Sequence, residues 1–342
     1  MRGNYFLGKG KFEVRETGIP EIREDEVLVQ VAACGICGTD VHIYHGEKGS
    51  AEVTPPVVLG HEFAGVVVRT GAKVTRVQPG DHVTADPNRY CGACRPCRMG
   101  RKQNCEHLFA LGVNVNGGFE EYVAVPEAQC FRVDPEIPLD VAAMAEPLAC
   151  VIHGIDLCHI QPGMNVLVIG GGTIGQMMLQ MARLSGAARV LLSEPIEMRR
   201  EMALRFGADA AFDPIHEDPV ACVEKLTCGE GADVIIECVG RPFAVEQALK
   251  VAGNGTMILL FSVPGVEDTV QLPLFDVYKK ELKISGSMIN PDTHQRAVNL
   301  INGRRLHLQE LITHHYGLEG LEEGIHMQMS AESIKVVVHP QE

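Results

Sequence analysis

The chain has 342 residues, 46% of them hydrophobic, which is long for one compact core, and we therefore expect two domains. Its net charge of −14 and the lack of a basic block argue against a nucleic-acid-binding protein. The first twenty residues lack the apolar core of a signal peptide, and no apolar run of about eighteen residues follows. We expect a cytoplasmic protein without a membrane span, whose twelve cysteines are metal ligands or buried thiols rather than disulfides.

The first half of the chain reads as β-structure. Short β-branched runs predict strands over residues 27–31 and 63–68, and a turn signal follows at 78–81. Two glycines at 117–118 precede a further predicted strand over 119–125.

Four cysteines lie within fifteen residues in the pattern C-x2-C-x2-C-x7-C, at Cys91, Cys94, Cys97 and Cys105. Four thiolates in tetrahedral geometry form a closed zinc site. A bacterial iron–sulfur run would have a last gap of three residues followed by proline, and this chain has neither feature. The pattern therefore favours zinc. Because a closed site has no open position for a substrate, we predict that this zinc is structural.

Strands and helices alternate after residue 150. Predicted strands cover 166–169, 188–195, 211–212, 233–237, 256–261 and 282–286. Such alternation predicts an α/β fold with a doubly wound parallel sheet. Residues 293–342 are predicted to hold a helix over 295–302, a short apolar stretch and a final strand over 335–338.

A glycine turn, G-x-G-x-x-G, follows the predicted strand 166–169 and opens a helix, which is the arrangement that holds a dinucleotide pyrophosphate. Glu194 ends the next strand, where a carboxylate bonds ribose hydroxyls and repels a 2′-phosphate. This favours NAD over NADP, although Arg199 and Arg200 weaken the preference. A tight turn without a ligand is the alternative. The predicted cofactor-binding residues are Gly170, Gly172, Thr173, Ile174, Gly175, Glu194, Arg199, Val239 and Gly240.

A second set of donors consists of Cys37, His61, Glu62 and Glu146. A cysteine, a histidine and a carboxylate make a three-ligand zinc site whose fourth position is open for chemistry. Spacing alone leaves this grouping open, because a lone histidine or glutamate is more often a surface or capping residue.

The chain resembles the zinc-dependent medium-chain alcohol and polyol dehydrogenases along nearly its whole length. The motifs that carry the resemblance are CGICGTDVHIYHGE (34–47), GHEFAGVVVRTGAKVTRVQPGDHV (60–83), the four-cysteine lobe (91–105), GGFEEYVAVP (117–126), AEPLAC (145–150) and VLVIGGGTIG (166–175). The resemblance implies a GroES-like β-barrel catalytic domain formed by 1–151 and 293–342. It also implies a Rossmann NAD-binding domain over 152–292.

The resemblance implies two zinc ions per chain, one catalytic and one structural. Cys37 and His61 match catalytic zinc ligands; we expect Glu62 as the third ligand and Glu146 to bind directly or through water. Animal-type alcohol dehydrogenases carry cysteine at the Glu146 position, so glutamate points to the polyol and threonine branches. Thr39 and His42 match a proton relay from the substrate hydroxyl to solvent, for which the pKa of histidine near 6.5 is suitable. A turn residue and a surface histidine are the alternatives.

The substrate motifs divide between two branches. CGICGTDVHIY resembles L-threonine dehydrogenase, whereas DPNRYCGACRPCRMG, HLFALGVNVNGGFEEYVAVP and MAEPLACVIHGIDL resemble bacterial polyol dehydrogenases. We predict oxidation of a secondary alcohol in a sorbitol-, iditol- or arabinitol-type polyol, with L-threonine 3-dehydrogenase as the alternative. A phosphorylated sugar alcohol, held by Lys48 and Arg89, and a non-catalytic zinc-binding member are further alternatives. The family likeness also implies a homotetramer or homodimer.

Overall fold

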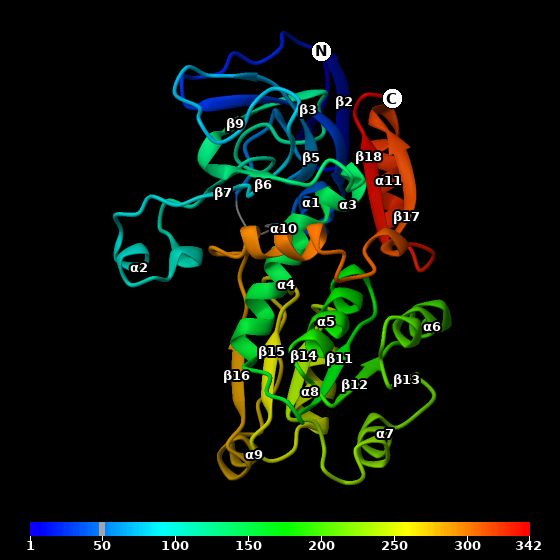
Figure 1. Cartoon of the computed structure of the whole chain (residues 1–342). Coiled ribbons are helices and arrows are strands. Elements are labelled where there is room, and N and C mark those ends of the chain that lie inside the picture. The colour runs from blue at the N-terminus through cyan, green and yellow to red at the C-terminus, as the bar shows by residue number, and fades with distance from the viewer. Residues whose placement is uncertain (48–51) are drawn as a thin grey trace. The chain divides into compact units, whose positions relative to one another are not determined.

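The computed structural model describes residues 1–47 and 52–342 and divides them into two compact units (Figure 1). Unit 1 comprises Met1–Ala149 and Asn290–Glu342, and unit 2 comprises Cys150–Ile289. The predicted divisions, after residues 151 and 292, lie within a few residues of these boundaries. Lys48, a candidate phosphate ligand, lies outside the described residues.

Unit 1 is built mainly from antiparallel strands. Its strands are β1 (Arg2–Gly8), β2 (Lys11–Glu16), β3 (Glu26–Gly35), β4 (Val57–Val58), β5 (Glu62–Thr70), β6 (His82–Ala85), β7 (Asn88–Arg89), β8 (Phe109–Ala110), β9 (Tyr122–Pro126), β10 (Cys130–Arg132), β17 (Ile312–Gly317) and β18 (Lys335–His339). The largest sheet has the order β10-β6-β5-β3-β18-β17, with β9 also paired to β3. The C-terminal strands thereby join the N-terminal ones in one sheet.

Strand β3 is the centre of this unit because it pairs with β5, β9 and β18. Val29 lies opposite Val67 on one side and Val123 on the other, and all three belong to one buried apolar cluster. The predicted strand over 119–125 begins only at Tyr122, because Phe119 instead bonds the Leu59 carbonyl and is fully buried.

The helices of unit 1 are short. They are α1 (Gly38–Tyr44), α2 (Arg95–Arg98), α3 (Leu139–Ala143), α10 (His294–Asn302) and α11 (Leu321–Gln328), and α4 (Ala145–Cys158) contains the division between the units. Within the described chain, no helix is both long and apolar enough to span a membrane.

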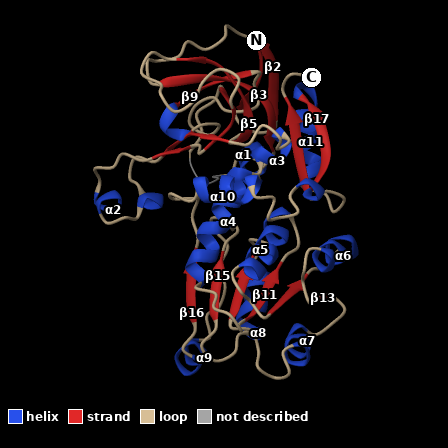
Figure 2. Cartoon of the chain, viewed as in Figure 1, coloured by secondary structure: helices blue, strands red, loops and turns tan. Residues whose placement is uncertain are grey.

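Unit 2 is a parallel sheet flanked by helices (Figure 2). Its strands are β11 (Asn165–Ile169), β12 (Arg189–Ser193), β13 (Ala210–Phe212), β14 (Val234–Glu237), β15 (Met257–Leu260) and β16 (Lys283–Gly286). Its helices are α5 (Thr173–Leu184), α6 (Glu197–Arg205), α7 (Pro219–Leu226), α8 (Pro242–Val251) and α9 (Leu274–Lys280). The strand order β13-β12-β11-β14-β15-β16, with every neighbouring pair parallel, is the doubly wound Rossmann order. The predicted fold class is confirmed.

Candidate functional site

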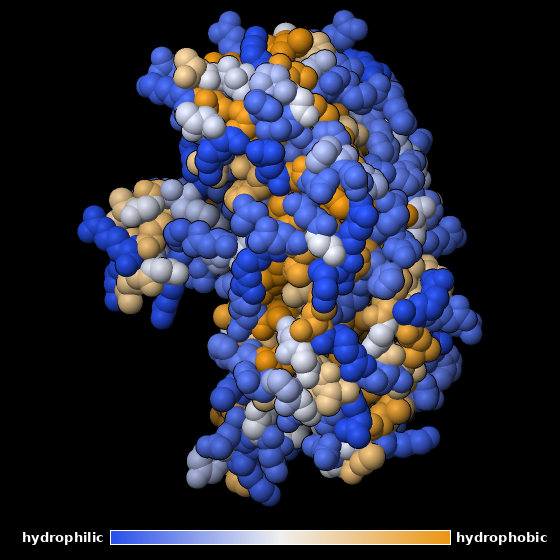
Figure 3. Space-filling view, viewed as in Figure 1, coloured by the Kyte–Doolittle hydropathy of each residue, from blue (hydrophilic) through white to orange (hydrophobic). Residues whose placement is uncertain are grey.

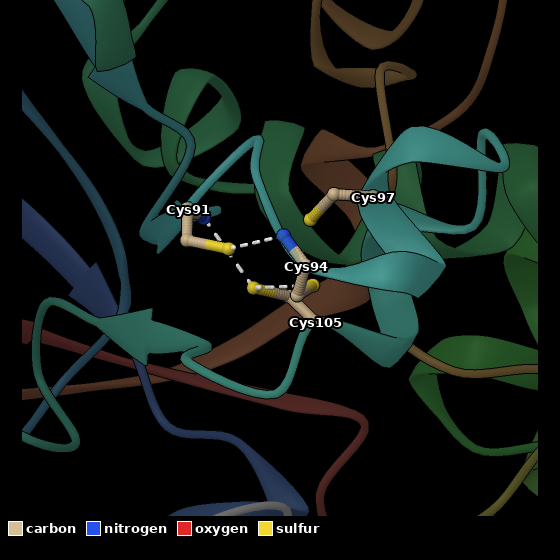
Figure 4. Close-up of side chains that lie close together, drawn as sticks. All are labelled: Cys91, Cys94, Cys97 and Cys105. Atoms are coloured by element: carbon tan, nitrogen blue, oxygen red, sulfur yellow. Dashed lines mark hydrogen bonds between the residues drawn. The ribbon is translucent and has the colours of Figure 1, made fainter.

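The four-cysteine lobe brings its sulfur atoms together, as Figure 4 shows. The four Sγ atoms all lie within 4.8 Å of one another, and those of Cys94 and Cys105 are 3.9 Å apart. Zinc–sulfur bonds of about 2.3 Å at tetrahedral angles place sulfurs roughly 3.8 Å apart. A disulfide would require about 2.05 Å. The spacing therefore fits a tetrahedral metal ion.

The lobe has little apolar core to hold it together. Helix α2 and the 3-10 turn Lys102–Asn104 bury none of their residues, and both hydrophilic and apolar side chains reach the lobe surface (Figure 3). Backbone amides of Ala93 and Cys94 instead donate to the Cys91 sulfur at 3.4 and 3.3 Å, and lower the pKa of that thiol to about 6. Amides that stabilise thiolate, in a segment without its own core, are what a structural zinc site needs.

Replacing Cys105 with serine is expected to remove one zinc per chain and to lower the melting temperature by several degrees, because metal binding stabilises this segment. The other zinc should be retained. Metal analysis and calorimetry, with Cys222→Ser as a control outside both clusters, test this. Unchanged metal content would contradict a metal site in the lobe.

A second cluster combines Cys37, His61 and Glu62, with one donor atom from each within 4.8 Å of the others. Cys37 is the N-cap of α1, where its amide donates to Asp40 Oδ2 at 2.9 Å. Strand β5 begins at Glu62, and His61 immediately precedes it. The preceding Gly60 has a φ of +93°, and a Cβ there would meet the Cys34 sulfur at 2.7 Å, so glycine is required at this bend.

His61 is surrounded by negative charge. Burial lowers the pKa of His61, but anionic neighbours, led by Cys37 and Asp40, hold the pKa well above its usual value. Glu146 acts in the same direction from the first turn of α4. Excess buried negative charge around this imidazole calls for a cation, so these residues fit zinc.

Asp40 and Lys335 were not predicted from the sequence. Asp40 is fully buried, and its Oδ1 lies 3.7 Å from His61 Nδ1, which is how a carboxylate orients a ligand histidine. Lys335, at the start of β18, forms a buried ion pair with Glu62 and donates to the Ile36 carbonyl at 2.8 Å. The sequence indicated Lys335 only through its position, as a lysine directly before three buried valines of β18.

The predicted relay residues both lie on α1. Thr39 is buried in its first turn, and His42 lies in the last turn with its side chain 25% exposed. The Nδ1 of His42 is 2.6 Å from Glu47 Oε2. The helix thus carries a hydroxyl near Cys37 and an imidazole that reaches solvent. Glu146 is buried, but it lies outside the group formed by Cys37, His61 and Glu62.

The glycine turn of unit 2 borders a cavity of about 700 Å³, a size that suits a cofactor. Gly170 has a φ of +95°, and a Cβ on Gly175 would lie 1.8 Å from the Gly170 carbonyl oxygen. Thr173, Ile174 and Gly175 form the first turn of α5. The Glu194 carboxylate lines the cavity and accepts from the amides of Gly171 at 2.6 Å and Ile196 at 2.9 Å.

The other residues predicted to affect cofactor binding differ in whether they line this cavity. Arg199 and Val239 line the same cavity, whereas Arg200 donates to the carbonyls of Glu194 and Pro195. Glu237, which was not predicted, accepts from the amides of Val239 and Gly240 at 2.6 and 2.8 Å and so fixes the turn after β14. Its position at the carboxyl end of a buried strand is the sequence feature that could have indicated a role beside the cofactor cavity.

The comparisons with known proteins agree with this arrangement. The family description "Alcohol dehydrogenase GroES-like domain" matches residues 23–135, and "Zinc-binding dehydrogenase" matches 173–303. An L-threonine 3-dehydrogenase from Bacillus licheniformis is 37% identical over 326 residues, covering 94% of this chain and 93% of that protein.

Several solved structures resemble the whole chain. One, from Sinorhizobium meliloti 1021, is assigned to the zinc-binding dehydrogenases and is bound to NADP; it is 39% identical, covers 99% of each chain and has a TM-score of 0.94. Galactitol-1-phosphate dehydrogenase from Escherichia coli is 29% identical, covers 99% of this chain and 100% of its own, and has a TM-score of 0.90. Fold, donor clusters and relatives define a zinc-binding dehydrogenase. The chain belongs to the zinc-dependent medium-chain alcohol and polyol dehydrogenases.

Proposed function

We propose that the protein oxidises a secondary alcohol with NAD and zinc, and that its substrate is the C3 hydroxyl of L-threonine. The observation that supports the chemistry is the Cys37–His61–Glu62 cluster in unit 1, whose histidine and glutamate are buried, in a chain whose unit 2 carries the glycine-lined cavity. The curated L-threonine 3-dehydrogenases are 34–38% identical to this chain, whereas the galactitol-1-phosphate dehydrogenase is 29% identical. This difference favours threonine over the polyol that the sequence motifs suggested.

Different residues of the chain would bind zinc and transfer the proton. Cys37, His61 and Glu62 hold zinc, which when bound supplies the Lewis acidity that lowers the pKa of the substrate hydroxyl. Thr39 accepts the hydroxyl proton while it gives up its own, and the relay ends at His42, which releases a proton to solvent. The glycine-lined cavity of unit 2 would hold NAD, whose chemistry is to accept a hydride, so that the alcohol and NAD would become a ketone, NADH and one released proton.

The first test is NADH formation by zinc-loaded protein from L-threonine, D-sorbitol and D-arabinitol, each at several concentrations. The proposal expects the highest kcat/KM for L-threonine. Because a site that hydrogen-bonds its substrate discriminates against analogues lacking the group, the difference should be large. Turnover of a polyol without threonine would replace the proposed substrate and keep the chemistry. No turnover of any secondary alcohol would contradict both.

A phosphorylated polyol is the second candidate, supported by the likeness to galactitol-1-phosphate dehydrogenase. The Arg89 guanidinium lies 4.7 Å above the Phe109 ring, in the β7–β8 pair. A guanidinium placed over an aromatic face can keep the N–H donors at its own edge free for a phosphate. If galactitol 1-phosphate is oxidised, Arg89→Met should raise its KM and leave that of L-threonine unchanged.

Replacing Glu194 with glutamine is expected to shift the cofactor preference toward NADP. The carboxylate would repel a 2′-phosphate, so its neutralisation should raise the NADP-to-NAD ratio of kcat/KM at least about tenfold, or ~1.4 kcal/mol. Glu197→Gln, an exposed glutamate of α6, is the matched control. An unchanged ratio in Glu194→Gln would show that Glu194 does not set the preference.

A further inference from the structure

A third set of metal-ligating side chains converges in unit 1, outside both cysteine-containing clusters. It joins Asp140 of α3, His315 of β17 and His339 at the end of β18, with one donor atom from each within 4.8 Å of the others. In Figure 1, α3 lies beside the neighbouring strands β17 and β18. We propose that Asp140, His315 and His339 bind a divalent transition metal ion of the zinc class.

The sheet register brings the two imidazoles together. In the parallel pair β17–β18, His315 lies opposite Val337, and Gly317 lies opposite His339. The two histidines are therefore diagonal neighbours on one face of the sheet. Their rings stack with centroids 5.2 Å apart.

A backbone contact orients His339. Its Nδ1 lies 3.1 Å from the Ala32 carbonyl oxygen, which can only accept a hydrogen bond. Nδ1 therefore carries the proton, and the lone pair of the neutral ring is on Nε2. That atom lies 3.0 Å from His315 Nδ1 and 3.8 Å from Asp140 Oδ1. Protein metal sites hold their histidines in this way, with the second nitrogen bonded to a carbonyl.

The two imidazoles lie within hydrogen-bonding distance of each other, whereas Asp140 does not lie within that distance of either ring. Ligand atoms about 2.0–2.1 Å from a tetrahedral metal lie roughly 3.3 Å apart. The nearest contacts in the cluster are 3.0 Å between the imidazole nitrogens and 3.8 Å from each histidine to Asp140. At 3.8 Å the carboxylate is too far to hydrogen-bond either ring, so a cation between the three groups would satisfy all of them.

The donor set selects the kind of metal. Two imidazoles and one carboxylate suit Zn²⁺, Co²⁺, Ni²⁺ or Cu²⁺, whereas Mg²⁺ and Ca²⁺ prefer oxygen ligands. The side chains of His315, Asp140 and His339 are 47%, 23% and 19% exposed, so an ion can reach them from solvent. Because no thiolate takes part, this site should release zinc more readily than the four-cysteine lobe.

The site predicts a third zinc per chain that fills only at raised free zinc. Zinc-loaded protein is dialysed against zinc buffers from nanomolar to micromolar free metal, and bound zinc is measured by mass spectrometry. The wild type should gain one further zinc across this range. His315→Ala and Asp140→Asn should bind that ion at least about tenfold more weakly. His307→Ala removes an exposed histidine outside the cluster, whose Nδ1 lies 3.2 Å from Glu310 Oε1; it is the matched control and should behave as the wild type does.

A melting-temperature rise in micromolar zinc, present in the wild type and reduced in both variants, gives a second readout, because ligand binding stabilises the folded state. Equal zinc uptake by the wild type, His315→Ala and Asp140→Asn would overturn the proposal. The same holds if none of them gains zinc. The test does not depend on the substrate, because neither readout requires turnover.

Discussion

Replacing Cys37 with serine is expected to lower kcat/KM for L-threonine by about 10⁴-fold, or ~5.5 kcal/mol, because the zinc that polarises the substrate hydroxyl loses a ligand. Zinc content at nanomolar free metal should fall from two ions per chain to one. Bound NAD should still be detectable by fluorescence quenching, because the cofactor cavity is lined entirely by unit 2.

The control is Cys222→Ser, another half-exposed cysteine, which lies on α7 outside the metal-ligand groups of the described chain. It should keep both zinc ions and full activity. If Cys37→Ser kept wild-type activity, or lost no zinc, the cluster around His61 would not be the catalytic metal centre. If it lost both zinc ions, the change would have unfolded unit 1, and circular dichroism would reveal this.

In zinc-free protein, replacing Lys335 with methionine is expected to lower the free energy of unfolding by about 3–5 kcal/mol, because it leaves the Glu62 carboxylate buried without its lysine partner. Lys335 and Glu62 are 3% and 2% exposed, so water cannot replace the lost ion pair. Urea denaturation followed by circular dichroism measures the change. A loss below 1 kcal/mol would show that Glu62 is stabilised by other groups.

Two comparisons separate the ion pair from general effects of the substitution. Lys73→Met removes a surface lysine that lies 2.7 Å from Glu24, and it should cost less than about 1 kcal/mol. The double variant Lys335→Met/Glu62→Gln should recover part of the loss, because no buried charge then remains unpaired. A double variant as unstable as the sum of both single changes would argue against coupling.

Features coded within a short stretch of sequence could be predicted. The strands of unit 2 are apolar runs that the parallel sheet buries on both faces, so β11, β12 and β14 were recognisable. The glycine turn and the four-cysteine lobe each lie within fifteen residues, and their spacing alone indicates phosphate or metal binding.

Features formed by distant residues could not be predicted in the same way. Glu62 and Lys335 are 273 positions apart, and only the pairing of both β5 and β18 with β3 brings them together. Strand β17, with the sequence ITHHYG, lacks the apolar alternation of a half-buried strand, so its two histidines gave no strand signal. The Asp140–His315–His339 cluster depends on that strand and was missed for the same reason.

The fate of the carbon-bound hydrogen tests the central claim, oxidation of a secondary alcohol by hydride transfer, most directly. Zinc-loaded protein is incubated with NAD and L-threonine that carries deuterium at C3, and the nicotinamide product is analysed by mass spectrometry. The account predicts NADH that contains the deuterium. Unchanged NAD with L-threonine and with every polyol of the panel, or reduced nicotinamide without deuterium, would contradict it.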